Sequence, residues 1–274
     1  MASDIVLAAR PAARRGLGRL ARALISDPWA LAALGLAALA LYWSATGSAP
    51  EAARQLWHWW PGLLRGLGMN VRISLLAMAL GTGLGLLVGA LSLSPAGPMR
   101  ALALLYVQAF RNAPILVLVY FTTYVFPFEI AIGGWSAPFE DWTKVVIGLA
   151  LPASANVAEI FRGAVQSIPG AQWEAGLSLG YTRAQIYRAV VLPQCLRRML
   201  APWMNLYASI TMSTSLASLV GVHDLVDTAT VASNTVARTD FTVLIYFTLL
   251  AMFFAYCYPI ARLTRHLERR YARH

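Results

Sequence analysis

Long apolar runs separated by short polar stretches dominate this chain. The runs cover residues 29–45, 67–93, 101–126, 144–165, 199–220 and 241–261. They approach or exceed the ~20 residues that a helix needs to cross about 30 Å of hydrocarbon. The pattern predicts an all-α, polytopic membrane protein with about six transmembrane helices. An arginine-rich N-terminal segment, residues 1–28, precedes the first run. The second run contains Gly81, Gly83, Gly85 and Gly89, small residues that permit close helix contact.

The first apolar run has a second possible interpretation. Residues 1–28 carry five arginines, and positive charge followed by an apolar run is also typical of a secretory signal. However, this run ends near Tyr42 and Trp43, an interfacial pair, and lacks a clean small-residue cleavage site. We therefore interpret it as a short first span.

The longest polar interruption after residue 60 is the stretch 174–193, EAGLSLGYTRAQIYRAVVLP. Thr182 follows Gly180 and is placed to cap a second short helix. Pro193 is expected to end that helix, because proline lacks an amide and disfavours helical geometry before it. The stretch predicts two short amphipathic helices hinged at a glycine between spans. An ordinary helix-turn-helix connection is the simpler alternative.

The distribution of basic residues predicts the topology. The formal net charge is +10, and 21 of the 22 basic residues are arginines, most of them beside the ends of apolar runs. This placement argues against nucleic acid as a partner and for a membrane topology signal. With the N-terminus inside, cytoplasmic segments hold 16 basic residues and outer segments hold 4. Both termini and the 174–193 stretch are therefore predicted in the cytoplasm.

Composition excludes several other classes of protein. With 58% hydrophobic and 12% charged residues, the chain is not a soluble globular domain. Lys144 is the only lysine and lies in no phosphate-binding loop, so any ATP would have to bind to another chain. Cys195 and Cys257 are far apart and form no metal-ligand spacing. No catalytic residues, metal site or cofactor are predicted in this chain.

Three polar groups inside the spans are candidates for function. Arg111 and Asn112 lie about ten residues into the third run, roughly 15 Å by helical rise. Pro114 follows them and is expected to break the helix there. Such a centre must face protein or a cavity, and Arg111 is either a carboxylate partner or the counter-ion of a buried acid. Glu159 and Arg162 share one helix face, so they either neutralise each other or leave Glu159 to meet a substrate amino group.

The third group is the hydroxyl-rich end of the fifth run, residues 209–218, which includes Ser213, Thr214 and Ser215. Hydroxyls can bond back to their own helix or across to another, so helix packing alone accounts for them. Lining a polar path is the competing interpretation.

Several motifs together resemble the polar amino acid subfamily of ABC-importer permeases. The 174–193 stretch is similar to the EAA loop of that family, although Gly176 and Val190 depart from its usual form. The other matching pieces are YVQAFRNAPILV (106–117), VAEIFRGAVQSIP (157–169) and TSLASLVGV (214–222). The resemblance covers residues 60–270 and implies a type I importer fold. The corresponding domain, residues 29–274, would include a cytoplasmic coupling loop at 166–198.

The resemblance also implies partners and sites. A second permease subunit, a dimer of ATPase subunits that bind ATP and Mg²⁺, and a periplasmic binding protein would assemble with this chain in a bacterial inner membrane. Contact with the ATPase would involve the loop residues Glu174, Ala175, Gly176, Gly180, Leu192 and Pro193. The substrate path would involve Arg111, Asn112, Asn156, Glu159, Ser213, Thr214 and Ser215.

Two departures from the family pattern leave the substrate class open. Members often have Lys-Asp where this chain has Met212 and Ser213, and many have Tyr at the position of Asn156. These differences also fit one half of a heteromeric permease pair. An ion-coupled secondary amino acid transporter and a channel are the two alternative functions, and co-purification with an ATPase distinguishes the permease from both.

Overall fold

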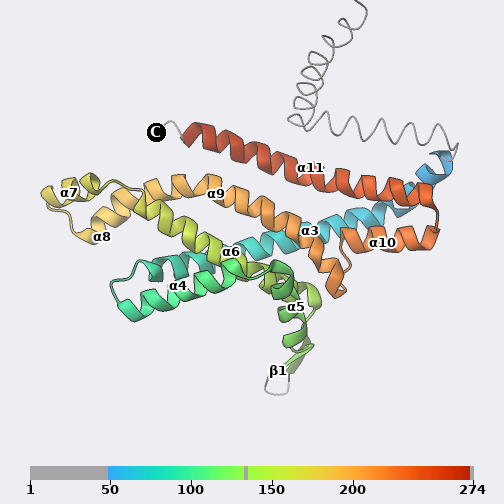
Figure 1. The fold of residues 1–274 in the computed structure, drawn as a ribbon, viewed down its shortest axis with the longest axis horizontal. Helices are drawn as coiled ribbons and strands as arrows, with labels where there is room; N and C mark the ends of the chain where they lie inside the picture. The colour runs from blue at the N-terminus through green and yellow to red at the C-terminus, as the bar shows by residue number, and fades with distance from the viewer. Residues whose placement is uncertain (1–48, 133–134, 272–274) are drawn as a thin grey trace, which may run out of the picture. The chain divides into compact units, whose positions relative to one another are not determined.

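The computed structural model describes residues 49–132 and 135–271, so the predicted N-terminal segment 1–28 and first span 29–45 lie outside the described residues. The predicted helical fold is confirmed, with one added β-hairpin. In chain order the elements are α3 (Ala49–Ser92), α4 (Gly97–Asn112), α5 (Ile115–Val125), β1 (Glu129–Ile132), β2 (Trp135–Pro138), α6 (Asp141–Gln166), α7 (Gly170–Ser178), α8 (Arg183–Ile186), the π-helical turn η1 (Tyr187–Val191), α9 (Leu192–Ser213), the 3-10 helix η2 (Thr214–Val220), α10 (Leu225–Val236) and α11 (Thr239–Tyr271) (Figure 1).

Three described helices are long and apolar enough to cross a membrane: Pro50–Ser92, Asp141–Gln166 and Thr239–Leu267. They occupy the places of the predicted second, fourth and sixth spans. The pair α4 and α5 adds a fourth if it is counted as one broken span. Helix α9 stands where the fifth span was predicted but falls outside this set among the described residues. Its early turns carry Arg197 and Arg198, which lower its apolarity.

The break predicted in the third span is a sharp bend. The chain bends by 103° between helices α4 and α5 (Figure 1). Pro114 is the N-cap of α5, and Ala113 before it is extended, with φ −74° and ψ 136°. Proline imposes this geometry because it lacks an amide and excludes the preceding residue from the helical region. Arg111 and Asn112 therefore lie in the last turn of α4, directly before the bend.

Helix α3 approaches α6 closely through glycines. A Cβ on Gly81 would lie 2.8 Å from the Ala153 side chain, and one on Gly85 would lie 2.5 Å from the carbonyl oxygen of Ser154. Gly89, one turn further on, is equally close to α6. Larger side chains would separate the two helices, which confirms that these small residues serve helix contact.

The described residues form two compact units. In the first, which holds described residues 49–58 and 236–244, Ala52 and Leu244 are buried against each other. The second unit holds described residues 59–235 and 245–271 and every residue with a predicted function. Within it, α6 contacts α4, α5 and α9. Its two larger apolar clusters are one that contains Ile73, Met78, Val119, Leu149 and Ile210, and one that contains Phe161, Ile168, Ile186, Val191, Cys195 and Met199.

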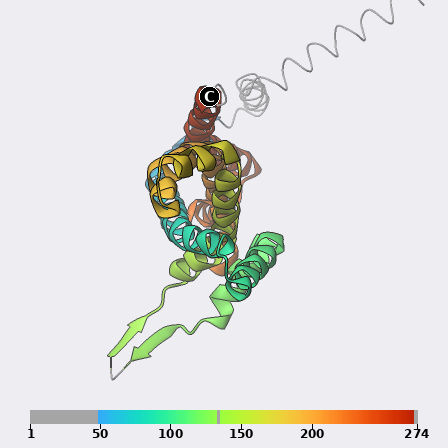
Figure 2. The same ribbon diagram turned by 90° about the vertical axis from the view of Figure 1, so that its left-hand side faces the viewer.

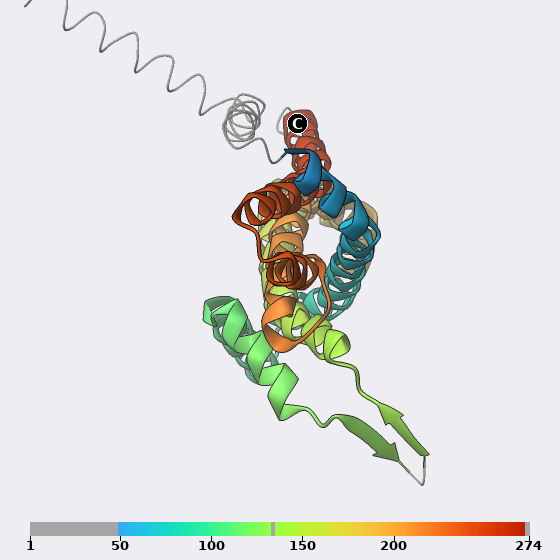
Figure 3. The ribbon, with the colours of Figure 1, turned by 90° about the vertical axis from the view of Figure 1, so that its right-hand side faces the viewer.

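The hairpin β1–β2 is an antiparallel pair that extends beyond the helices of the second unit (Figures 2 and 3). No strands were expected in residues 128–143. A two-stranded hairpin is marginally stable alone, and here a buried cation holds its base. The Nζ atom of the fully buried Lys144 lies 2.9 Å from Oδ1 of Asp141 and 4.2 Å from the ring centroid of Phe128.

Candidate functional site

The 166–198 loop contains two short helices joined at a glycine, as predicted. Gly180 has a φ of +78°, a left-handed conformation that favours glycine. Thr182 then caps α8 through a pair of hydrogen bonds with Gln185. The backbone amide of Thr182 donates to Oε1 of Gln185 at 2.8 Å, and the backbone amide of Gln185 donates to Oγ1 of Thr182 at 3.4 Å. This capping box confirms the predicted start of the second helix.

The prediction that Pro193 ends the second helix is wrong. Helix α8 passes through the π-helical turn η1 directly into α9, with Pro193 in its first turn. The Leu192 amide bonds to the carbonyl of Tyr187, five residues back. Proline is tolerated at the start of a helix, where its missing amide needs no intrahelical partner. The wider turn before it lets the chain continue without a break.

Gly176 departs from the alanine usual in the EAA motif, and the packing explains why. A Cβ at this position would lie 2.7 Å from Cγ1 and 2.8 Å from Cδ1 of Ile186. Ile186 is fully buried. A bulky residue on α8 therefore fills the space that an alanine methyl would take on α7, and it fixes the angle between the two helices.

The loop also has an exposed, partly apolar face around the turn between α7 and α8. Leu179 is 76% exposed and Tyr181 is 47% exposed, and both flank Gly180. Glu174, Ala175 and Pro193 are also exposed, whereas Leu192 is half-buried. Exposed apolar side chains grouped on an ordered helical segment are typical of an interaction surface.

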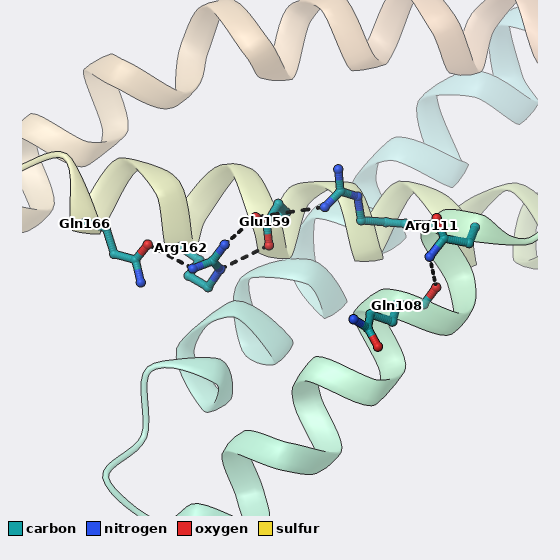
Figure 4. Close-up of polar contacts among 6 residues, drawn as sticks. Gln108, Arg111, Glu159, Arg162 and Gln166 are labelled. Atoms are coloured by element: carbon teal, nitrogen blue, oxygen red, sulfur yellow. Dashed lines mark hydrogen bonds and ion pairs between the residues drawn. The ribbon is translucent and has the colours of Figure 1, made fainter.

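A second candidate site joins the end of α4 to α6 (Figure 4). Arg162 donates to both carboxylate oxygens of Glu159, with Nε 3.1 Å from Oε2 and Nη2 2.5 Å from Oε1, and also to Oε1 of Gln166 at 2.9 Å. Nη1 of Arg111 lies 3.9 Å from Oε1 of Glu159. We call these four residues the charged cluster. Sequence analysis did not identify Gln166, although its i+4 spacing from Arg162 indicates the contact.

The remaining amides predicted for the path bond within their own helices. Asn112 donates to the backbone carbonyl of Gln108 at 2.8 Å, at the exposed end of α4. Asn156, one turn before the charged cluster on α6, donates to the carbonyl of Pro152 at 2.8 Å. Both side chains retain further hydrogen-bonding capacity, because an amide carries two donor hydrogens and an acceptor oxygen.

The three hydroxyl residues differ in environment. Ser213 and Ser215 are partly exposed and donate to backbone carbonyls about one turn earlier, those of Ser209 and Met212 in α9. Thr214 is fully buried, and its Oγ1 accepts from Nδ2 of Asn70 at 3.1 Å. Of the three path residues predicted here, Ser213 and Ser215 are therefore partly accessible, whereas Thr214 is part of the protein interior.

Asn70 belongs to a buried polar network that sequence analysis missed. Its Nδ2 also donates to Oδ2 of Asp224 at 3.0 Å, and its Oδ1 accepts from the Leu225 amide at 3.0 Å. Asp224 lies before α10, outside the spanning helices, and its Oδ1 accepts from the Asp227 amide at 2.8 Å. Burial raises the pKa of Asp224 to about 6. A lone asparagine within the apolar second run was the available signal.

Comparison with known proteins identifies the family. Residues 81–273 match the family described as binding-protein-dependent transport system inner membrane component. The probable amino-acid ABC transporter permease protein YckA of Bacillus subtilis is 32% identical over 213 residues, which cover 77% of this chain and 90% of the relative. The glutamine transport system permease protein GlnP of Escherichia coli is 35% identical over 170 residues, covering 62% and 76%.

Solved structures agree in fold. A crystal structure of an amino acid ABC transporter with histidines has a TM-score of 0.68 at 26% identity, covering 78% of this chain and 96% of that one. An inward-facing structure of the MetNI methionine ABC transporter has a TM-score of 0.54 at 17% identity, covering 75% and 95%, and supports the fold alone.

These matches favour the permease over the secondary transporter and the channel. In this family the chain that spans the membrane and the chain that hydrolyses ATP are separate, which agrees with the lack of a phosphate-binding loop here. This chain belongs to the family of binding-protein-dependent transport system inner membrane components, and it is a permease subunit of an ABC importer with the type I fold.

Proposed function

We propose that this permease carries amino acids and forms the translocation path together with a second permease subunit. The names of its relatives, which include amino-acid and glutamine permeases, support this substrate class. A periplasmic binding protein would deliver the substrate, as the family description implies. A pair of ATPase subunits would bind ATP and Mg²⁺ on the cytoplasmic side.

The exposed face of the 166–198 loop supports the ATPase contact. Leu179 and Tyr181 present apolar area at the hinge, and Glu174 is exposed earlier in α7. The buried side, where Gly176 meets Ile186, keeps this face in one shape. An ordered surface loses little conformational entropy when it binds, which favours a tight contact. We therefore assign Glu174, Ala175, Gly176, Gly180, Leu192 and Pro193 to this interface or to its support.

The charged cluster supports the substrate path. An amino acid zwitterion needs a cation for its carboxylate and an acceptor for its ammonium group, because desolvating either charge unpaired costs several kcal/mol. Arg111 and Glu159 supply these two charges from different helices. Arg111 is the more available of the two arginines, since its 3.9 Å separation from Glu159 exceeds hydrogen-bond distance.

Neighbouring polar groups complete the proposed path. Asn112 and Asn156 stand beside the cluster on α4 and α6, and Ser213 and Ser215 offer partly exposed hydroxyls at the junction of α9 and η2. Thr214 would act indirectly, by holding η2 against α3 through Asn70.

The arginine asymmetry supports a bacterial inner-membrane orientation with both termini in the cytoplasm. Single cysteines at Ala137 in β2 and at Thr182 in the loop test this orientation. A membrane-impermeant maleimide applied to intact spheroplasts should label the first and spare the second. Labelling of Thr182→Cys from outside would contradict both the orientation and the ATPase contact.

The transport function is tested by uptake into proteoliposomes that contain the permease pair, the ATPase and the binding protein. We expect accumulation of a radiolabelled amino acid that requires ATP inside the vesicles and the binding protein outside. Accumulation driven by an ion gradient, without ATP, would contradict the proposal.

A further inference from the structure

Two polar contacts within the 166–198 loop join α7 to the start of α9, and the start of α9 to the end of α6. The first is a reciprocal amide pair between α7 and α9. Nε2 of Gln194 donates to Oε1 of Gln172 at 2.7 Å, and Nε2 of Gln172 donates to Oε1 of Gln194 at 3.4 Å. Both side chains are half-buried, so the pair is shielded from competing water. The two residues are 22 positions apart, so the pair is a tertiary contact.

The second contact joins α9 to the end of α6. Nη1 of Arg198 donates to both the carbonyl and the hydroxyl oxygen of Ser167, each at 2.7 Å. Ser167 is the C-cap of α6. Carbonyls at a helix C-terminus lack intrahelical partners and carry partial negative charge, so a cation is favoured there. Arg198 therefore caps a helix other than its own.

An apolar layer fills the space between these contacts. Ile168, after α6, packs in one buried cluster with Ile186 of α8 and Cys195 of α9. Trp173 of α7 packs against the same cluster. The end of α6, the loop helices and the start of α9 therefore share one core, and closely packed groups of this kind move together.

The connection between α7 and α8 is the weak point of this arrangement. Gly180 is left-handed, and a Cβ built on it would meet nothing within 4 Å, so the turn is held by backbone hydrogen bonds, such as that from the Tyr181 amide to the Gly176 carbonyl, and not by side chains packed on the glycine. Helix α8 continues through η1 into α9. Helix α7 instead depends on Trp173, on the Gly176–Ile186 contact and on the amide pair to keep its place beside α9.

We propose that Gln172, Gln194 and Arg198 are positioning residues that couple movement of α7 to α6 and α9. This inference rests on the proposed contact between the loop and the ATPase. Helix α6 runs unbroken from Glu159 to Gln166, and Ser167 is about 12 Å along the helix from Glu159 by helical rise. A displacement of α7 would therefore reach the charged cluster through a rigid helix. Without the two contacts, ATP hydrolysis would continue, but less of the movement of α7 would reach α6 and α9.

The test measures amino acid uptake per ATP hydrolysed in proteoliposomes that contain the complete transporter and its binding protein. Gln194→Leu should lower this ratio by about tenfold, because both hydrogen bonds of the amide pair are lost. The double variant Gln172→Glu/Gln194→Lys replaces the pair with an ion pair and should restore at least half of the ratio. Arg198→Ala should also lower the ratio. Arg198→Lys should have a higher ratio than Arg198→Ala, close to that of the wild type, since a single nitrogen of Arg198 makes both bonds to Ser167.

Gln55→Leu is the matched control. It removes an exposed glutamine amide that bonds to Glu51 within α3, so the ratio should not change. Wild-type ratios in both Gln194→Leu and Arg198→Ala would overturn the inference, and so would low ratios that the double variant and Arg198→Lys fail to restore. If Gln194→Leu or Arg198→Ala fails to retain the ATPase, the inference is judged by whether the double variant or Arg198→Lys has a restored ratio of uptake to ATP hydrolysed. Failure of the wild-type permease to retain the ATPase would instead contradict the proposed function.

Discussion

Replacing Arg111 and Arg162 separately with Ala should affect stability and transport in opposite orders. Arg162 makes two hydrogen bonds to Glu159 and one to Gln166 within α6. These groups are partly exposed, so their loss should cost about 1 kcal/mol after solvent screening. Arg111 contributes one ion pair at 3.9 Å with 43% of its side chain exposed. Its loss should cost less than about 0.5 kcal/mol, because Glu159 remains paired with Arg162.

Transport should show the reverse order. If Arg111 receives the substrate carboxylate, removing it loses a charge-assisted hydrogen bond, which is worth about 1.5–3 kcal/mol. Uptake at low substrate concentration should fall by about tenfold or more in Arg111→Ala. Arg162→Ala should lower uptake less, because Glu159 keeps its negative charge and Arg111 remains in place. Arg111→Lys retains the charge and should keep part of the activity.

The assay compares binding-protein-dependent uptake with the thermal unfolding midpoint of the purified transporter, at matched expression. Wild-type uptake in Arg111→Ala would refute the assignment of Arg111 to the substrate. A larger transport loss in Arg162→Ala, without a matching loss of stability, would show that Arg162 is the functional arginine. In a structure with substrate bound, a ligand more than one bridging water from both Arg111 and Glu159 would assign the cluster to the scaffold.

Three further predictions concern stability and are measured by thermal unfolding or hydrogen exchange. Gly176→Ala should destabilise the permease by about 1–3 kcal/mol through overpacking against Ile186, and adding Ile186→Ala should cost less than the sum of the two single changes; additive costs would argue against the contact. The pKa of Asp224 is raised from 3.8 to about 6 in the folded state, so its proton stabilises the folded state fully below the lower value, and this stabilisation is lost as pH rises to the higher one. The unfolding midpoint should therefore fall between about pH 4 and 6 in the wild type, and by less in Asp224→Asn. Lys144→Met should speed amide exchange in β1 and β2, because the hairpin loses the cation between Asp141 and Phe128, and unchanged exchange would show that the hairpin is held by other contacts.

Features set by local chemistry were predictable from the sequence. Glycines at 81, 85 and 89 indicated close helix contact, and α6 approaches them. Pro114 indicated a break in the third span, and Gly180 followed by Thr182 indicated a hinge and a helix cap. In each case the responsible residues lie within one or two turns of the feature that they produce.

Features set by tertiary contacts were not predictable in the same way. Pro193 indicated a helix end, yet the π-helical turn before it accommodates the missing amide while Val191 and Cys195 are buried in the core. The bonds from Asn70 to Thr214 and Asp224 span 144 and 154 positions, so no local pattern indicates them. The substitution of Gly176 for the usual alanine becomes intelligible only once Ile186 is seen against it.

The central claim is that the exposed face of the 166–198 loop binds the ATPase, and a cysteine cross-link at Leu179 tests it most directly. With Cys195 and Cys257 replaced by Ala, Leu179→Cys should cross-link to the ATPase in membranes through a short heterobifunctional reagent that joins its thiol to lysine amines of the ATPase. Leu105→Cys, an equally apolar and 64% exposed position on α4, is the matched control and should not cross-link. A cross-link at position 179 that changes in yield when ATP is added would support the claim. No cross-link at position 179, in membranes where the ATPase co-purifies with the permease, would contradict it.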